Sequence, residues 1–240
     1  MTDRYENLMS DIEKGAIKIL DSGVSTELER RGCRMGESYW SGRVSIDAFE
    51  TLVDTHKAYI DSGADIITTN SFASSRLILN DSQNLQDIDE INNKNIEAAL
   101  TARETLGANE ILIAGSLSHQ VAWQRAGHTF KQQIDIPVSD EDMAQAFDEI
   151  ISYFENGEVD VILLEMMAIP RRINLLFESL STTSLPVWCG FSAKRFENMS
   201  SLCSWHDRSV KFREIVELAG DCSFDIFGIM HSSVDIISEC

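Results

Sequence analysis

Short apolar runs alternate with segments of helical periodicity along almost the whole chain, and this alternation constrains the fold more than any other feature. Six runs are rich in Ile, Val and Leu, and each is followed by polar or small residues. They cover residues 17–20, 64–67, 111–114, 159–164, 186–191 and 224–230. Short, continuous apolar runs are typical of strands buried on both faces of a parallel sheet. Regular β–α alternation therefore predicts an α/β fold, either a doubly wound sheet or a closed barrel.

The segments between these runs carry apolar residues at the helical period. The clearest helix is expected after Ser139, because a serine side chain suits an N-cap and Gly157 can end the helix. Its apolar face would hold Met143, Ala146, Phe147, Ile150, Ile151 and Phe154. Further helices are expected near residues 47–61, 88–106, 171–180 and 208–219.

Charge and composition narrow the classes of function. Twenty basic and 39 acidic residues give a net charge of −19. Such a balance argues against nucleic acid or an anionic membrane as a partner, because binding phosphates requires clustered Lys and Arg. With 43% hydrophobic residues, the 240 residues can form one sizeable core, so we expect a single domain over residues 1–240.

Targeting signals and cysteine usage indicate the compartment. Residues 1–7 are polar and mixed in charge, unlike a signal peptide, and no apolar stretch is long enough to cross a bilayer. The five cysteines are odd in number and none lies at a CxxC spacing. We therefore expect reduced thiols and a cytoplasmic protein.

Polar residues at the strand ends mark the expected position of the site. The first expected strand-to-helix turn lacks the GxGxxG and GxxxxGK[ST] patterns that bind nucleotide phosphates. Asp21, Thr69, Glu165 and His231 instead follow four of the apolar runs. In a barrel, the active site is built at these carboxyl ends of the strands.

Several segments, in order, resemble the homocysteine S-methyltransferase family. Residues 19–23 (Ile-Leu-Asp-Ser-Gly) are similar to the Asp-Gly-Gly/Ala end of that family's first strand. Residues 63–72, from Gly-Ala-Asp-Ile-Ile to Thr-Asn-Ser-Phe, resemble its second unit. Residues 114–116 (Ala-Gly-Ser) and residues 159–165, which end in Glu165, match the third and fourth strands. The resemblance extends from about residue 15 to about residue 231.

This resemblance implies a (β/α)8 TIM-barrel fold and a methyl transfer. Members of the family move a methyl group from a donor such as S-methylmethionine to the thiol of homocysteine, which gives methionine. Zn²⁺ bound by three cysteines removes the thiol proton and holds the sulfur. Those cysteines belong to an Asn-Cys pair after the sixth strand and a Gly-Gly-Cys-Cys segment at the eighth.

The chain departs from the family at these zinc positions. Met230-His231 stands where the family has Asn-Cys, and no Gly-Gly-Cys-Cys segment is found. Six β/α units in 240 residues take about 40 residues each, so we expect an incomplete, C-terminally truncated barrel that lacks its last two units. His231 is a residue type that binds zinc, but one ligand does not make a site. We therefore expect no intact metal site, no bound zinc and no methyl transfer by this chain.

The resemblance also implies a set of substrate-binding residues. Asp21, Thr69 and Glu165 match residues that hold the amino acid in the family, and Trp40 matches a tryptophan that lines the pocket in some relatives. Gly23 belongs to the glycine turn after the first strand, where Ser22 replaces a family glycine. A carboxylate suits the ammonium group of homocysteine, and hydroxyl or amide donors suit its carboxylate.

Several hypotheses follow and stay open at this point. The chain is a piece of a methyltransferase, or a catalytically inactive homologue that serves as a binding or assembly module. In a third hypothesis, two copies form a homo-oligomer that covers the open edges of the barrel. The pocket could also bind another small amino acid or sulfur compound, and the sequence does not name the methyl donor.

Overall fold

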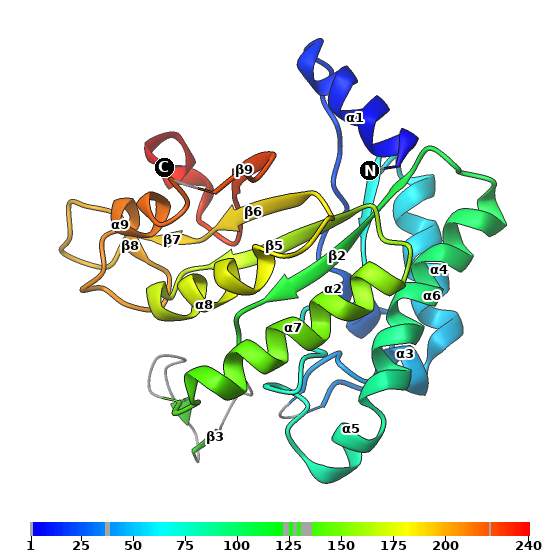
Figure 1. Cartoon of the computed structure of the whole chain (residues 1–240), viewed down its shortest axis with the longest axis horizontal. Helices are drawn as coiled ribbons and strands as arrows, with labels where there is room; N and C mark the ends of the chain where they lie inside the picture. The colour runs from blue at the N-terminus through cyan, green and yellow to red at the C-terminus, as the bar shows by residue number, and fades with distance from the viewer. Residues whose placement is uncertain (1, 37–38, 122–124, 127–128, 131–135, 221) are drawn as a thin grey trace.

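A computed structural model describes residues 2–36, 39–121, 125–126, 129–130, 136–220 and 222–240. Its centre is a parallel sheet with the strand order β1-β2-β5-β6-β9. These strands are β1 (Ile66–Thr68), β2 (Leu112–Ser118), β5 (Val161–Met167), β6 (Val187–Phe191) and β9 (Ile226–Ile229). Each strand pairs with the strand of the next β/α unit, so the order never reverses as it does in a doubly wound sheet. The expected barrel-type α/β fold is confirmed (Figure 1).

The helices are α1 (Asp3–Glu13), α2 (Val24–Arg30), α3 (Val44–Asp47), α4 (Phe49–Asp61), α5 (Ser82–Gln86), α6 (Ile88–Leu106), α7 (Asp140–Asn156), α8 (Pro170–Leu180) and α9 (Phe212–Glu217), with a 3₁₀ helix, η2 (Val234–Glu239). Of these, α4, α6, α7, α8 and α9 lie where the sequence periodicity predicts helices, whereas α1, α2, α3 and α5 were not predicted. Ser139 caps α7 by accepting the amide of Asp142 at 3.0 Å, as expected. The helix expected at 208–219 is shorter, because α9 begins only at Phe212.

The first apolar run differs from the expectation of six strands. Residues 17–20 run parallel to β1, but Leu20 makes only a single bridge to Ile66. The amide of Asp21 donates to the Ile66 carbonyl, and the amide of Ile66 donates to the Ile19 carbonyl. The pairing is too short to form a strand of the five-stranded sheet. Its side chains stay in contact with solvent, since Ile17 is 85% exposed.

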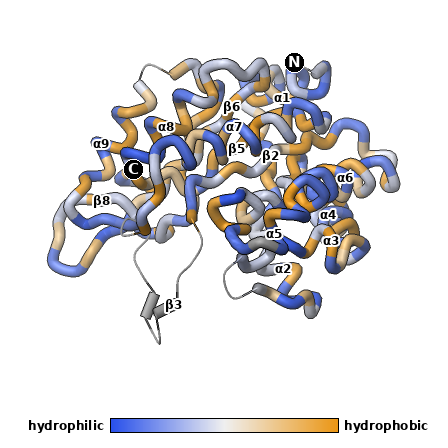
Figure 2. Tube along the Cα trace, turned by 60° about the horizontal axis from the view of Figure 1, so that its bottom comes forward, coloured by the Kyte–Doolittle hydropathy of each residue, from blue (hydrophilic) through white to orange (hydrophobic). Residues whose placement is uncertain are grey.

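Two apolar layers cover the sheet. On one face, Ile67, Ile113 and Ile162 pack against the apolar sides of α6, α7 and α8. The colours along these helices in Figure 2 alternate between hydrophobic and hydrophilic, as this one-sided packing requires. On the other face, Leu112 and Trp188 contact α1, which lies across the strands from α7 and α8 in Figure 1.

Helix α1 is fixed to the amino-terminal end of the sheet by polar contacts. Arg4 donates to Asp160 at 2.8 Å, and Arg103 of α6 donates to the other carboxylate oxygen at 3.1 Å. Tyr5 donates to Asp225 at 2.7 Å and accepts from the Trp188 indole at 3.0 Å. These bonds close the amino-terminal side of the sheet and leave its carboxyl end open.

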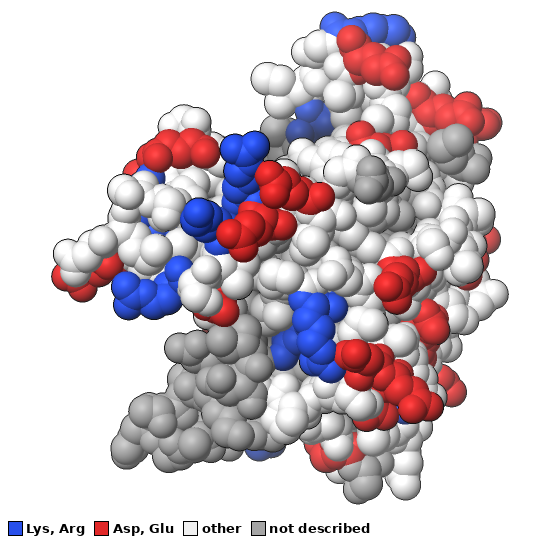
Figure 3. Space-filling view, turned by 60° about the vertical axis from the view of Figure 1, so that its left-hand side comes forward, with Lys and Arg blue, Asp and Glu red and all other residues white. Residues whose placement is uncertain are grey.

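Two short hairpins, β3 (Arg125–Ala126) with β4 (Thr129–Phe130) and β7 (Ala193–Lys194) with β8 (Cys203–Ser204), complete the described elements. No helix in the described part of the chain is long and apolar enough to cross a membrane. On the face drawn in Figure 3, Lys and Arg lie among Asp and Glu and form no continuous basic surface.

Candidate functional site

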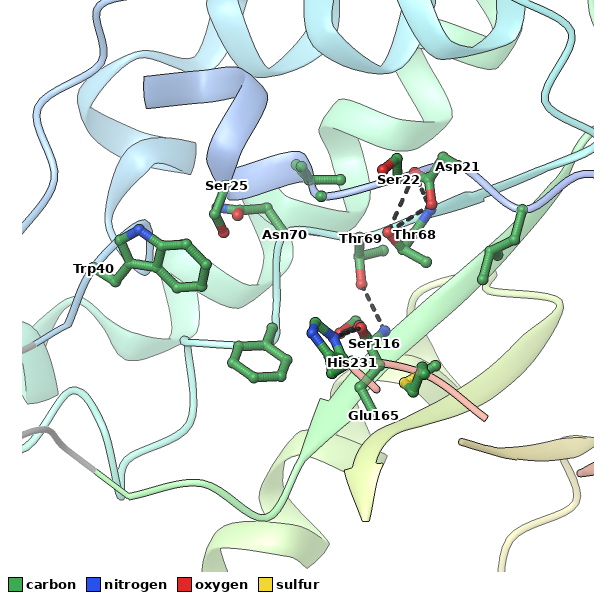
Figure 4. Close-up of a pocket in the computed structure, with 15 residues that line it drawn as sticks. Asp21, Ser22, Ser25, Trp40, Thr68, Thr69, Asn70, Ser116, Glu165 and His231 are labelled. Atoms are coloured by element: carbon green, nitrogen blue, oxygen red, sulfur yellow. Dashed lines mark hydrogen bonds and ion pairs between the residues drawn. The ribbon is translucent and has the colours of Figure 1, made fainter. Parts of the chain in front are cut away.

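One pocket of about 250 Å³ opens at the carboxyl ends of the strands. It is lined by Leu20, Asp21, Ser22, Gly23, Val24, Ser25, Trp40, Thr68, Thr69, Asn70, Phe72, Ser116, Glu165, Met230 and His231. All six residues named from the sequence, namely Asp21, Gly23, Trp40, Thr69, Glu165 and His231, therefore lie around one cavity (Figure 4). No Lys or Arg is among the lining residues, so carboxyl groups dominate the charge of the pocket.

Asp21 follows the first apolar run and is held by the end of β1. Its carboxylate accepts the backbone amide of Thr68 at 2.8 Å and the Thr68 hydroxyl at 3.0 Å. Burial raises the pKa of the Asp21 carboxyl to about 8, and the negative charge of Glu165 adds to the rise, while the bonds from Thr68 oppose it. The carboxyl group of the free protein is therefore largely protonated at neutral pH and must lose this proton to pair with a cation.

Thr69 is part of a hydroxyl chain behind the pocket wall. Its hydroxyl accepts the Ser116 amide at 3.1 Å and lies 2.6 Å from the hydroxyl of Ser71. Because the Ser71 hydroxyl donates to the Ser116 carbonyl at 2.7 Å, Thr69 must donate to Ser71. The Thr69 proton is therefore engaged, and one lone pair remains that can accept from a ligand.

Glu165 and His231 form the opposite side of the pocket. One carboxylate oxygen of Glu165 accepts from the Ser116 hydroxyl, and the other lies 3.6 Å from Nε2 of His231. Strand β5 continues past Glu165 to Met167, with a register shift between Leu164 and Met167. Glu165 therefore lies inside the strand rather than after it. His231 has a left-handed backbone, with φ of +49°.

Aromatic rings close one side of the pocket. Trp40 meets Phe72 edge to face at 6.3 Å, and Phe72 lies 6.3 Å from the ring of His231. Trp40 also has a left-handed backbone, with φ of +46°. Such a wall offers an apolar surface to the side chain of a ligand, and aromatic faces also attract cations.

The turn at Gly23 leads into α2, whose first amides have no partner within the helix. Gly23 is the N-cap residue without a side-chain cap, and Gly23, Val24 and Ser25 at the start of α2 are among the lining residues of the pocket. Behind it, the Ser25 hydroxyl bonds Ser41 at 2.6 Å, and Ser41 in turn bonds Asn70 at 3.0 Å. These buried bonds fix α2 against the end of β1.

Some pocket residues were missed from the sequence. Thr68, not Thr69, holds Asp21, and Ser116 links the hydroxyl chain to Glu165. Both lie in segments marked as polar strand ends, but which of two adjacent threonines faces Asp21 depends on the strand register. Phe72 joins Trp40 to His231 and belongs to the quoted segment 63–72.

A zinc site of cysteine thiolates does not fit the pocket. None of its lining residues is a cysteine, and the described part of the chain holds no group of three or more His, Cys, Asp and Glu side chains that could bind a metal. Cys189 of β6 lies in the helix-covered core, where burial raises the pKa of its thiol. A thiol that resists ionisation in an apolar core is unsuited to bind zinc.

Comparisons with known proteins agree with this arrangement. A family model described as homocysteine S-methyltransferase matches residues 18–226. Homocysteine S-methyltransferase of Escherichia coli (strain K12) is 27% identical over 203 residues, which are 79% of this chain and 63% of that protein. Selenocysteine Se-methyltransferase of Brassica oleracea var. italica is 24% identical over 209 residues, which are 79% of this chain and 59% of that protein.

The fold has a solved counterpart. The crystal structure of the homocysteine methyltransferase MmuM from Escherichia coli, metallated form, superposes with a TM-score of 0.71 at 24% identity, over 92% of this chain and 76% of that one. At this identity the likeness supports the barrel-type fold alone. The chain spans 63% and 59% of the length of the two relatives named above.

Proposed function

Because the chain belongs to the homocysteine S-methyltransferase family, we propose that its pocket binds the amino-acid part of homocysteine. The observation that carries the proposal is the meeting of Asp21 and Glu165 in a cavity that no Lys or Arg lines among the described residues. Two carboxyl groups with only the imidazole of His231 as a basic neighbour on the pocket wall form a site for a cation, and the ammonium group of an amino acid is such a cation. Thr69 can accept a further bond from this ammonium group through its open lone pair.

The start of α2 supplies donors of the opposite kind. Gly23 and the first residues of α2 line the pocket, and the free amides of a helix start suit a carboxylate. An amino acid can therefore lie with its carboxylate toward Gly23 and its ammonium group toward Asp21 and Glu165. Its side chain then runs along Trp40 and Phe72, where a thiol or thioether makes favourable contacts with the ring edges.

The same pocket supports binding better than methyl transfer. A thiol is largely protonated at neutral pH, and the family uses zinc to ionise it. The described residues do not offer a zinc-binding set, as the pocket has His231 but no cysteine. We therefore propose that this polypeptide by itself binds the amino acid without measurable formation of methionine, and that it retains little zinc.

The remaining parts of the proposal concern the cellular compartment and the oligomeric state. None of the five cysteines forms a disulfide, which suits a reducing cytoplasm. Ile17, Ile19 and Phe227 are exposed along the two outer segments of the sheet, which suits a second copy that covers these edges. Sedimentation of the purified protein tests the last point, and a monomer at all concentrations would contradict it.

Calorimetric titration tests the binding proposal. We expect homocysteine to bind the purified protein, and Glu165→Gln to weaken binding about tenfold, since the variant removes a charge that pairs with the ammonium group. Glu104→Gln is the matched control, because Glu104 is exposed on α6 and lies outside the pocket. Equal affinities of the wild type and Glu165→Gln would refute the assignment.

A non-catalytic small-amino-acid site on the same barrel is the second candidate, favoured by the absence of a fitting metal set in the described residues. Titration with homocysteine, methionine and cysteine separates the two. Preference for homocysteine supports the family substrate, whereas equal binding of all three indicates a general amino-acid pocket. Zinc analysis and a methyl-transfer assay with S-methylmethionine, with and without added zinc, test the proposed lack of turnover.

A further inference from the structure

The hydrogen bonds at Asp21 fix which oxygen of its carboxyl group carries the proton. The Thr68 amide donates to Oδ2 of Asp21 at 2.8 Å, so this oxygen acts as an acceptor. The other oxygen, Oδ1, lies 3.0 Å from the Thr68 hydroxyl, and Figure 4 draws these contacts beside the pocket. An oxygen that accepts an amide is a poor site for the proton, so the protonated group carries its hydrogen on Oδ1.

The Thr68 hydroxyl can bond Asp21 in two ways. It donates its hydrogen to an ionised carboxylate, whereas it accepts the Oδ1 hydrogen of a protonated carboxyl group. Among the described residues, this hydroxyl bonds no side chain other than Asp21, whose oxygens lie at 3.0 Å and 3.2 Å. When it accepts from Asp21, its own hydrogen is free to be donated into the pocket, which Thr68 lines. The charge state of Asp21 thus decides whether a ligand meets a negative charge or a neutral hydrogen-bond donor.

Three other titratable groups surround Asp21. Tyr59 of α4 stays neutral up to pH 9, because burial raises the pKa of its hydroxyl. Glu165 of β5 lines the same pocket, and its negative charge adds to the raised pKa of Asp21. His231 lies 3.6 Å from Glu165 on that wall. A variant that removes only the titration of Asp21 therefore separates its effect from those of Glu165 and His231.

A 2-hydroxy acid matches the pocket when Asp21 is protonated. Its carboxylate can lie toward Gly23, as that of an amino acid does, and its 2-hydroxyl group then takes the place of the ammonium group. This hydroxyl can accept from Thr68 and donate to the oxygen of Glu165 that Ser116 leaves open. Hydrogen bonds then run in one direction from Asp21 through Thr68 and the ligand to Glu165. An ammonium group cannot take this place, because it has no lone pair to accept the Thr68 hydrogen.

We propose that the pocket binds 2-hydroxy acids as a second class of ligand, with Thr68 passing a hydrogen bond from the neutral Asp21 carboxyl group to the ligand hydroxyl. This inference rests on the proposed function, since it uses the same orientation of the ligand. Binding of the hydroxy acid makes and breaks no covalent bond and leaves the proton on Asp21. An amino acid binds only after this proton has left for the solvent. The two classes of ligand therefore prefer opposite charge states of Asp21.

Two probes that differ only at the second carbon test the proposal. Methionine and 2-hydroxy-4-(methylthio)butanoate share the carboxylate and the thioether side chain. Each is titrated calorimetrically into the whole chain at pH 7, 8 and 9 and equal ionic strength. With a pKa of about 8, Asp21 is about 91% protonated at pH 7 and about 9% protonated at pH 9, so the hydroxy acid should bind about tenfold more weakly at pH 9. Methionine should bind more tightly at pH 8 than at pH 7.

Four variants assign the effect to these residues. Thr68→Val should weaken the hydroxy acid about fivefold at pH 7, because it removes the donor to the ligand hydroxyl, and Thr68→Ser should restore the affinity. Asp21→Asn donates as the protonated carboxyl group does, so its affinity for the hydroxy acid should be the same at all three pH values. Thr55→Val is the matched control, because the buried Thr55 hydroxyl donates to the Thr51 carbonyl at 2.8 Å and lies outside the pocket. It should bind both probes as the wild type does.

The outcomes separate this inference from the proposed function. Failure of the hydroxy acid to bind at pH 7, an affinity that stays level or rises toward pH 9, or equal losses in Thr68→Val and Thr55→Val would overturn the second class of ligand. The wild-type slope in Asp21→Asn would overturn it as well, because the titration would then belong to another group. Failure of homocysteine to bind, or unchanged homocysteine affinity in Glu165→Gln, would instead refute the function proposed for the pocket.

Discussion

The protonation state of Asp21 makes amino-acid binding depend on pH in a calculable way. Burial raises the pKa of this carboxyl to about 8, so in the free protein it is largely protonated at neutral pH. The titratable groups around it include Glu165 and His231, which line the same pocket, and Tyr59 of α4. An ammonium group pairs with the ionised carboxylate, so the affinity should follow the ionised fraction of Asp21.

The size of the effect follows from this pKa. A group with a pKa of 8 is about 9% ionised at pH 7 and about 50% ionised at pH 8. The apparent dissociation constant scales inversely with the competent fraction, so affinity should rise about fivefold between these two values. The free energy of unfolding depends on pH in the opposite direction. The folded state holds a proton that the unfolded chain releases near pH 4, so Asp21 disfavours folding increasingly as the pH rises toward 8.

Calorimetry with methionine checks this prediction, because methionine carries no thiol that would titrate in the same range. Titrations at pH 6, 7 and 8 and equal ionic strength should show the rise, and buffers of different ionisation heat should reveal proton release on binding. Asp21→Asn keeps an acceptor for Thr68 but cannot ionise, so its affinity should be lower and flat with pH. A flat wild-type profile, or the same slope in Asp21→Asn, would refute the reasoning.

Three further predictions concern stability and metal. Asp160→Asn should lower the free energy of unfolding in urea by ~3–5 kcal/mol, because it removes the fully buried carboxylate that pairs with both Arg4 and Arg103. Asp54→Asn removes the acidic partner of an exposed ion pair with Lys57 and should change the free energy of unfolding by less than ~1 kcal/mol. Equal losses of stability in Asp160→Asn and Asp54→Asn would contradict this account. Burial lowers the pKa of His56 to about 4, so stability present above pH 6.5 should fall by ~2–3 kcal/mol by pH 4.5. His56→Leu should remove that part of the slope, and an unchanged slope would exclude His56 as its cause. Protein purified from zinc-containing medium should carry far less than one zinc per chain, and stoichiometric zinc by elemental analysis would disprove the metal argument.

Much of the fold follows from local patterns. The strand-forming runs, the Ser139 cap and the apolar face of α7 depend on residues near in sequence, so periodicity and capping rules identify them. Helix α1 was not predicted, although Tyr5 and Leu8 form its buried side. The reason is that these residues are covered only by the inner face of the sheet, which is distant in sequence.

The site was predicted in position but not in detail. Asp21, Thr69, Glu165 and Trp40 line one pocket because the carboxyl ends of parallel strands meet. The partner of Asp21 is Thr68, since alternate residues of a strand face opposite sides and the register is set by pairing with Leu112 and its neighbours. The bulge before Met167 likewise places Glu165 inside β5, which no local pattern indicates.

A crystal structure of the protein with homocysteine would test the central claim most directly. We predict that the ammonium nitrogen lies within hydrogen-bond distance of Asp21 or Glu165, with the side chain along Trp40 and Phe72. A ligand bound away from both carboxyl groups, or with its carboxylate against them, would contradict the account.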